Sequence, residues 1–143
     1  MITLRVVNDM EKVSRLMEQM FCGVDSRFCL HGHSLAPQLD IYETADHFLV
    51  AAELAGVASE DVEVVVDRIH LRLSGKRRQA DPTEAFRVHQ SEISYGDFSR
   101  VFRMPCAIDP EGVEAAMENG MLRIKLPKAP SCPALIEIRD QTA

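Results

Sequence analysis

The chain has 143 residues, about one domain's length, of which 46% are hydrophobic and 27% charged. This composition is typical of a soluble globular protein rather than a disordered one. The formal net charge is −6 and Trp is absent, so nucleic acid is not expected as a partner, because phosphate binding uses clustered Lys and Arg. The longest unbroken apolar run, from Phe48 to Ala52, is far shorter than the roughly 20 residues that cross a bilayer, and no membrane partner is expected.

The cysteines indicate a reducing environment. Cys22, Cys29, Cys106 and Cys132 are too scattered for a disulfide framework, and the chain is long enough to build a core without disulfides. The first residues lack the basic start and apolar run of a secretory signal. We therefore expect free thiols and a cytoplasmic location.

Residues 1–37 predict an N-terminal arm with one short helix. Asn8 followed by Glu11 resembles a capping box. Apolar side chains follow at helical spacing on one face: Met10, Val13, Leu16, Met17, Met20 and Phe21. This face either packs on the domain behind it or binds partner proteins, because methionine is flexible and suits promiscuous contacts.

Two thiols and two imidazoles lie close together in the same arm. Cys22, Cys29, His31 and His33 are ligand types that zinc accepts. Their spacing, C-x6-C-x-H-x-H, matches none of the usual paired zinc motifs, which favours an arm segment without metal. A redox sensor at Cys22 and Cys29 is a further minority interpretation.

Residues 38–129 predict short strands separated by turns. Apolar and polar residues alternate in segments 39–42, 62–66, 69–73, 113–117 and 122–126. Gly75 follows segment 69–73, and the turn dipeptide Asn119-Gly120 follows segment 113–117. Segment 48–54 is almost entirely apolar, as in a strand buried on both faces. Asn119-Gly120 is the strongest hairpin signal. The pattern predicts an all-β, immunoglobulin-like antiparallel β-sandwich.

Residues 98–105 contain an unusual cation. Phe98, Phe102 and Met104 share one face, and alternation places Arg100 on that face. A guanidinium against an apolar layer is costly unless it is paired, so Arg100 should meet a carboxylate or another chain. It either reaches water at a sheet edge or forms an ion pair at a subunit contact.

The sequence gives no positive case for catalysis. It contains no G-x-S-x-G, P-loop, G-x-G-x-x-G or H-E-x-x-H motif. His47, His70 and His89 occur singly in strand-like surroundings, where a solvent-facing or hydrogen-bonded histidine is usual. We expect no enzyme, no catalytic residue and no cofactor.

An ordered set of motifs resembles the α-crystallin domain of small heat-shock proteins, in its bacterial form. In chain order they are DIYET (40–44), ELAGV (53–57), LRLSGKR (71–77), SYGDFSRVFRMP (94–105) and AAMENGMLRIKLPK (115–128). Two departures are mild: Ala55 stands where the family usually has Pro, and Met121 where it usually has Val. The resemblance covers roughly two thirds of the chain.

The resemblance also implies subunit contacts. The stretch from Arg78 to Ile93 resembles a loop whose strand, residues 86–89, pairs with a partner subunit, so dimer contacts are expected at Phe86, Val88 and Arg100.

Within the tail, residues 130–143, Ile136-Glu137-Ile138 matches the family's I-x-I anchor. Its two isoleucines point to one side of an extended segment, so both can enter apolar pockets. The expected groove lies between segments 62–66 and 113–117, at Val62, Val64, Val66, Val113, Ala115 and Met117.

The implied function is that of an ATP-independent holdase, which assembles from homodimers into larger oligomers and binds unfolding client proteins. Client contacts are expected on the arm, at Met10, Leu16, Met17, Met20 and Phe21. Two alternatives stay open. One is a CS-type co-chaperone module that docks as a monomer, and the other is a thiol- or metal-regulated sensor that uses residues 22–33.

Overall fold

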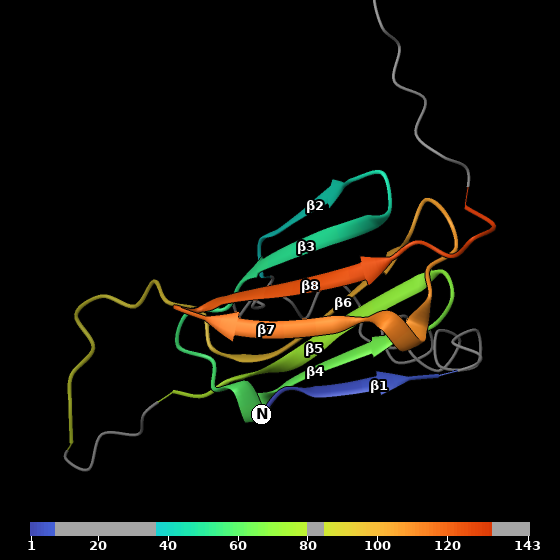
Figure 1. Cartoon of the computed structure of the whole chain (residues 1–143). Coiled ribbons are helices and arrows are strands. Elements are labelled where there is room, and N and C mark those ends of the chain that lie inside the picture. Colours follow the sequence, from blue (N-terminus) through green and yellow to red (C-terminus); the bar gives the residue numbers. More distant parts are fainter. Residues whose placement is uncertain (8–36, 80–84, 133–143) are drawn as a thin grey trace, which may run out of the picture.

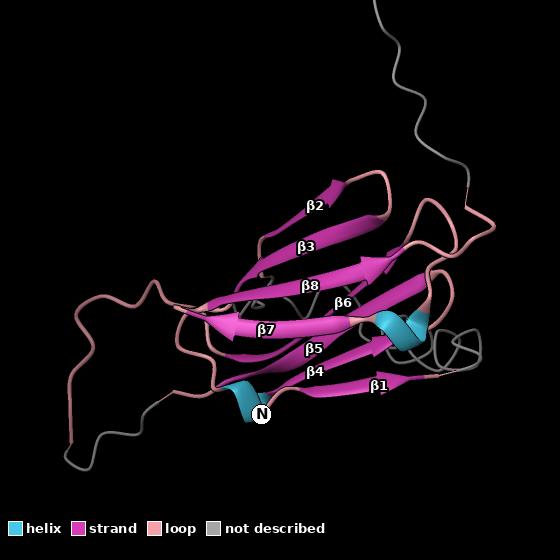
Figure 2. Cartoon of the chain, viewed as in Figure 1, coloured by secondary structure: helices cyan, strands magenta, loops and turns pink. Residues whose placement is uncertain are grey.

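The computed structural model describes residues 1–7, 37–79 and 85–132. In these residues eight strands and two short 3₁₀ helices are found (Figures 1 and 2). The strands are β1 (Thr3–Val6), β2 (Leu39–Glu43), β3 (His47–Glu53), β4 (Val62–Val66), β5 (His70–Arg77), β6 (Gly96–Arg103), β7 (Glu114–Glu118) and β8 (Met121–Pro127). The helices are η2 (Ser59–Asp61) and η3 (Pro110–Gly112).

The strands form two four-stranded sheets that enclose one core. One sheet has the order β1-β4-β5-β6 and the other β2-β3-β8-β7. Each neighbouring pair is antiparallel except β1 and β4, which run parallel. The largest fully buried side chains come from both sheets and their connections and include Phe48, Leu54, Leu71, Leu73, Ile108, Leu122, Ile124 and Leu126. The predicted β-sandwich is confirmed.

The prediction that the segment 48–54 is buried on both faces is wrong. Along β3, Phe48, Val50 and Ala52 are buried, but Leu49 is 38% exposed and Glu53 is exposed. Each sheet of a two-layer sandwich has an outer face that meets solvent. The outer face of β3 carries apolar side chains, which hid the alternation in the sequence.

The β7–β8 hairpin follows its turn dipeptide. Asn119 and Gly120 have φ angles of 52° and 76°, and two consecutive residues with positive φ are typical of a type I′ turn. This turn matches the right-handed twist of the strands it joins. The predicted hairpin is therefore confirmed, with Glu118 opposite Met121.

Gly75 does not end a strand, as the sequence pattern suggested, because β5 continues through it to Arg77. A Cβ atom at this position would overlap the backbone oxygen of Asp61 and lie 2.7 Å from Cζ of Phe98. Glycine within a strand often marks such a close approach of another backbone. The glycine thus lets the η2 turn pack directly on β5.

We expect Gly75→Ala to lower the free energy of unfolding by about 2–3 kcal/mol, because the backbone of Asp61 cannot move aside as a flexible side chain could. Urea unfolding measures the change. Lys76→Ala at the next, exposed position is the control, with an expected effect within about 0.5 kcal/mol. Equal effects of the two substitutions would contradict this account of Gly75.

A buried carboxylate fixes the turn between β4 and β5. Asp67 is only 6% exposed, and its Oδ1 accepts hydrogen bonds from the backbone N–H groups of Ile69 (2.8 Å) and His70 (2.6 Å). Its Oδ2 lies 3.0 Å from Nδ1 of His70. Burial raises the pKa of Asp67, but the hydrogen bonds from Ile69 and His70 outweigh it, and the net pKa is lowered.

A carboxyl group whose pKa is lowered by folding stabilises the fold above its unfolded-state pKa, near 4, and loses this contribution as the pH falls through its folded-state pKa. We expect Asp67→Asn to cost about 1–2 kcal/mol at pH 7. The difference from the parent chain should shrink below about pH 4. Urea unfolding at several pH values tests this, with the exposed Glu118→Gln as control. A deficit that is the same at pH 7 and pH 3 would contradict it.

Candidate functional site

One side of the predicted groove is the inner face of β4. Val62, Val64 and Val66 are each at most 1% exposed, because alternate residues of a strand point to the same face and this face meets the core. They belong to the same core cluster as Val113 from the segment before β7.

The other side of the groove is β7, the last strand of its sheet. Ala115 and Met117 are partly buried and pack against the core, whereas Glu114 and Glu118 are exposed. In Figure 1, β7 lies next to β8 at the edge of its sheet. The six residues predicted to line a groove thus all belong to the buried core cluster or pack against it, and their role as an anchor groove stays a prediction.

Strand β1 was not predicted from the sequence, and it covers the edge of β4. Leu4 pairs with Val64 and Val6 with Val66, and the N–H of Val7 donates to the Val66 carbonyl at 3.0 Å. Ile2 packs against the core. The start of the predicted arm, residues 1–37, therefore belongs to the sandwich.

The only signal for β1 in the sequence is a short alternation, in which the apolar residues Ile2, Leu4 and Val6 are separated by Thr3 and Arg5. Nε of Arg5 lies 3.1 Å from Oε1 of Glu63 on β4. Strand β1 pairs in parallel with β4, which lies far along the chain, so the sequence contains no hairpin turn that would predict the pairing.

The predicted dimer contacts Phe86 and Val88 are exposed. Each has 62% of its surface accessible, and Ile93 in the same segment has 65%. Residues 86–89 form no strand in this single chain. Their pairing with a partner subunit stays a prediction, and the apolar side chains are available for one.

Arg100, the third predicted dimer contact, finds partners within its own chain. Its guanidinium donates a hydrogen bond of 2.8 Å to the carbonyl of Pro37 and lies 4.8 Å from the ring centre of Phe102. These partners, a carbonyl and an aromatic ring, replace the carboxylate that the sequence suggested. Because Pro37 is buried, Arg100 ties the segment before β2 to β6.

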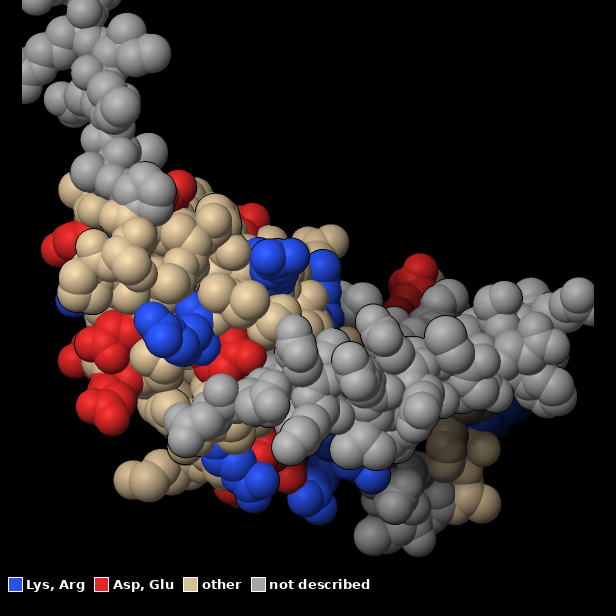
Figure 3. Space-filling model, turned by 90° about the vertical axis from the view of Figure 1, so that its right-hand side faces the viewer, with Lys and Arg blue, Asp and Glu red and all other residues tan. Residues whose placement is uncertain are grey.

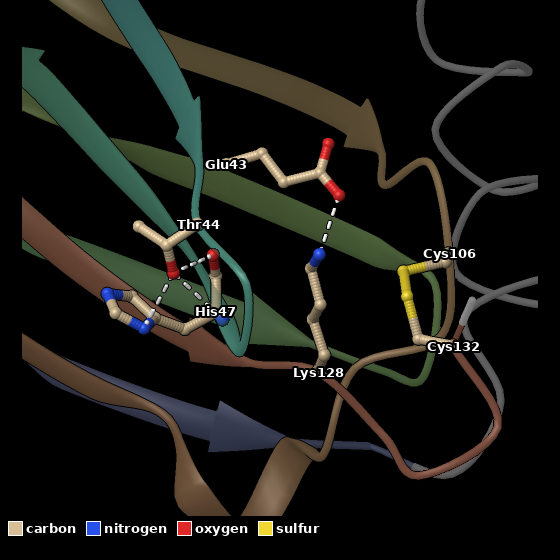
Figure 4. Close-up of a disulfide and its surroundings, with 6 residues drawn as sticks. All are labelled: Glu43, Thr44, His47, Cys106, Lys128 and Cys132. Carbon is tan, nitrogen blue, oxygen red and sulfur yellow. Dashed lines mark hydrogen bonds and ion pairs between the residues drawn. A yellow bond between two sulfur atoms is a disulfide. The ribbon is translucent and has the colours of Figure 1, made fainter. Parts of the chain in front are cut away.

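The expectation of free thiols is wrong for Cys106 and Cys132, which form a disulfide with 5.5 Å between their Cα atoms (Figure 4). The chain after β8 folds back on the segment after β6, where the N–H of Ala129 donates to the carbonyl of Ala107 at 2.9 Å. This long-range contact brings together cysteines that are 26 residues apart. The cytoplasmic location stays a prediction, and it can no longer be argued from four free thiols.

Lys128 also holds the chain after β8 in place, through contacts with the β2–β3 hairpin (Figure 4). Its Nζ lies 2.7 Å from Oε1 of Glu43 and 5.3 Å from the ring centre of Phe48, and its side chain is only 5% exposed. Its backbone N–H donates to the carbonyl of Asp46 at 2.8 Å. The start of the tail is therefore held in place through Cys132, and the predicted anchor begins four residues later.

His47 and His70 are hydrogen-bonded, as expected of isolated histidines. Nδ1 of His47 lies 2.6 Å from Oδ1 of Asp46 and 2.9 Å from Oγ1 of Thr44. The histidine His70 contacts Asp67 in the β4–β5 turn. Both histidines thus serve turns of the sandwich.

Several predicted site residues lie outside the described residues. They are Met10, Leu16, Met17, Met20 and Phe21 of the apolar arm, Cys22, Cys29, His31 and His33 of the thiol–imidazole segment, and the anchor residues Ile136 and Ile138.

Within residues 1–7, 37–79 and 85–132, no group of three or more His, Cys, Asp or Glu side chains could hold a metal ion. None of the helices in these ranges has the length and apolar character needed to cross a membrane.

The charged surface is mixed. On the face drawn in Figure 3, Lys and Arg side chains lie among Asp and Glu side chains. Among the described residues of that face there is no continuous basic stripe of the kind that nucleic-acid-binding proteins use. The exposed segment 85–95, in contrast, carries the apolar side chains Phe86, Val88 and Ile93.

Comparisons with known proteins agree with this geometry. The model of the Hsp20/alpha crystallin family matches residues 40–139. Spore protein SP21 of Stigmatella aurantiaca is 35% identical over 97 residues, which cover 68% of this chain and 57% of that protein. The chain thus spans less than two thirds of this relative's length.

Two solved structures match this chain over all or nearly all of their own length. Heat shock protein 16.0 of Schizosaccharomyces pombe is 34% identical, with a TM-score of 0.65, and the match covers 76% of this chain and 100% of that one. A small heat-shock protein of Xylella fastidiosa, described as having a distinct high order structure, is 30% identical, with a TM-score of 0.60 and coverages of 75% and 99%. The family match, which spans well over half of the sequence, and the shared β-sandwich together show that the chain belongs to the Hsp20/alpha crystallin family, the small heat-shock proteins.

Proposed function

We propose that this protein is an ATP-independent holdase, which assembles from homodimers into larger oligomers and keeps unfolding proteins from aggregating. The observation that carries the proposal is the membership of the Hsp20/alpha crystallin family, and the anchor site is proposed to be an aliphatic groove between β4 and β7. Val62, Val64 and Val66 on β4 are buried in this structure and Met117 on β7 is partly buried, so the proposed groove offers aliphatic side chains to an extended segment with branched residues at alternate positions once its cover opens. The tail segment Ile136-Glu137-Ile138 has this chemistry.

A dimer contact is supported by the exposed 85–95 segment. Phe86, Val88 and Ile93 are each more than 60% exposed, and several large apolar side chains gathered on one loop are typical of an interaction surface. In the proposed dimer, residues 86–89 add a strand to the partner's sheet, next to β2 or β6 at the free sheet edges. Covering these side chains would remove apolar surface from water.

Client binding is assigned to apolar surfaces that assembly leaves open or releases on warming. The arm residues Met10, Leu16, Met17, Met20 and Phe21 are the proposed client contacts, since methionine-rich faces adapt to different partners. Binding without an ATP cycle holds a client but does not refold it. We place the protein in the cytoplasm and assign it no enzymatic activity.

The test is the light scattering of a thermally unfolding client protein, with and without the full chain and in the absence of ATP. The expected result is suppressed aggregation at near-stoichiometric ratios, unchanged when ATP is added. A protein that does not suppress aggregation, or that does so only with ATP, would overturn the holdase proposal. A protein that is monomeric in solution would favour the docking-module alternative.

A further inference from the structure

The N-terminal strand and the tail carry the same chemical pattern. In β1 and the residue before it, Ile2, Leu4 and Val6 alternate with polar residues, and in the tail Ile136 and Ile138 flank Glu137. In an extended chain each set points to one side. Both segments therefore present aliphatic side chains at two-residue spacing, together with a backbone able to extend a sheet.

Strand β1 already occupies the place where the tail is proposed to bind. It pairs with β4 in the register Leu4–Val64 and Val6–Val66. Paired residues of neighbouring strands lie on the same face of a sheet, so Leu4 and Val6 lie on the same face as the buried Val64 and Val66. Ile2 packs against the same core cluster as Ala115 and Met117.

Simultaneous binding of both segments is excluded by the sheet itself. A strand has two hydrogen-bonding edges, and β5 pairs with one edge of β4 along Val62–Val66. The other edge is taken by β1. A tail segment that adds to β4 must therefore displace β1.

The attachment of β1 is weak enough for such a displacement. The strand has four residues, all exposed, and its inward-facing Leu4 and Val6 keep 38% and 46% of their surface accessible. Its ion pair, Arg5–Glu63, is at the surface, with the Arg5 side chain 67% exposed. Exposed ion pairs contribute little to stability.

We infer that β1 is an intramolecular competitor of the tail anchor: it covers the β4 edge until Ile136-Glu137-Ile138 of a second copy of this chain displaces it. This inference rests on the proposed role of the groove. A site that is open only part of the time binds its ligand more weakly, in proportion to the open fraction. The strand thus protects an aggregation-prone edge and limits assembly at low protein concentration.

The test uses the full-length chain with Ile136→Ser and Ile138→Ser, so that its own tails do not compete. Binding of a fluorescent peptide with the sequence of residues 133–143 is followed by anisotropy. A further substitution, either Leu4→Glu or Arg5→Glu, is added to release β1. Leu4→Glu replaces an apolar side chain of β1 by a charged one, and Arg5→Glu replaces the ion pair with Glu63 by two carboxylates that repel each other. Leu49→Glu is the matched control, because Leu49 has the same residue type and the same 38% exposure but lies on the outer face of β3.

We expect Leu4→Glu and Arg5→Glu each to tighten peptide binding at least about fivefold, while Leu49→Glu leaves it unchanged. A peptide with both isoleucines replaced by serine should not bind. Equal affinity in all chains would overturn the competition and leave the groove proposal standing. Weaker binding after Arg5→Glu would show that β1 supports the tail rather than competing with it. If the peptide binds none of the chains, the groove proposal fails and the competition with it.

Discussion

Replacing Ile136 and Ile138 by serine is expected to reduce the mass in solution from that of a many-subunit particle to about that of two chains, each of 16.0 kDa. Each isoleucine that enters an apolar pocket contributes about 1.5–3 kcal/mol. Since 1.4 kcal/mol corresponds to a tenfold change in affinity, the loss of two such side chains weakens every anchor contact more than about 100-fold. The proposed dimer, built on the exposed Phe86 and Val88, is left intact.

Light scattering on the full chain measures this effect, and Leu135→Ser with Glu137→Ser is the matched control, because these two residues alternate with the isoleucines. A truncation should end after Pro133. Ending it at Lys128 would also remove Cys132 and leave Cys106 without its disulfide partner. A double serine variant that keeps the parent mass would contradict the anchor proposal, whereas a monomeric parent would contradict self-assembly altogether.

The strands of the sandwich could be predicted because their signals are local. Alternation of buried and exposed residues and the Asn119-Gly120 turn suffice for β7, β8 and the hairpin between them. The ordered motifs that resemble the α-crystallin domain then gave the family, which the comparisons confirm over residues 40–139.

The missed features depend on contacts between distant segments. Four residues of alternation are too few to distinguish β1 from a loop, and its parallel pairing with β4 leaves no turn in the sequence. The need for glycine at position 75 is visible only once the Asp61 backbone is placed against it. The sequence placed the strands of the proposed groove, but it did not predict the strand that covers the edge of β4.

Reduction of the Cys106–Cys132 disulfide is expected to lower the free energy of unfolding by about 3 kcal/mol. The bond closes a loop of 26 residues, and a loop of this length restricts the unfolded chain by roughly that amount in the chain-entropy treatment. The loop includes η3, β7 and β8, so the effect falls on the strands that form one side of the groove. Urea unfolding with and without a dithiol reductant measures it.

The double variant Cys106→Ser with Cys132→Ser separates this bond from the other two thiols. In the absence of reductant it should unfold at the same urea concentration as the reduced parent, and reductant should not change it further. If Cys22 or Cys29 were responsible instead, the double variant would still respond to reductant. If the parent instead unfolds at the same urea concentration with and without reductant, the disulfide is not needed to hold the start of the tail. The contacts of Lys128 with Glu43 and Phe48 and the backbone hydrogen bonds of Lys128 and Ala129 would then be sufficient.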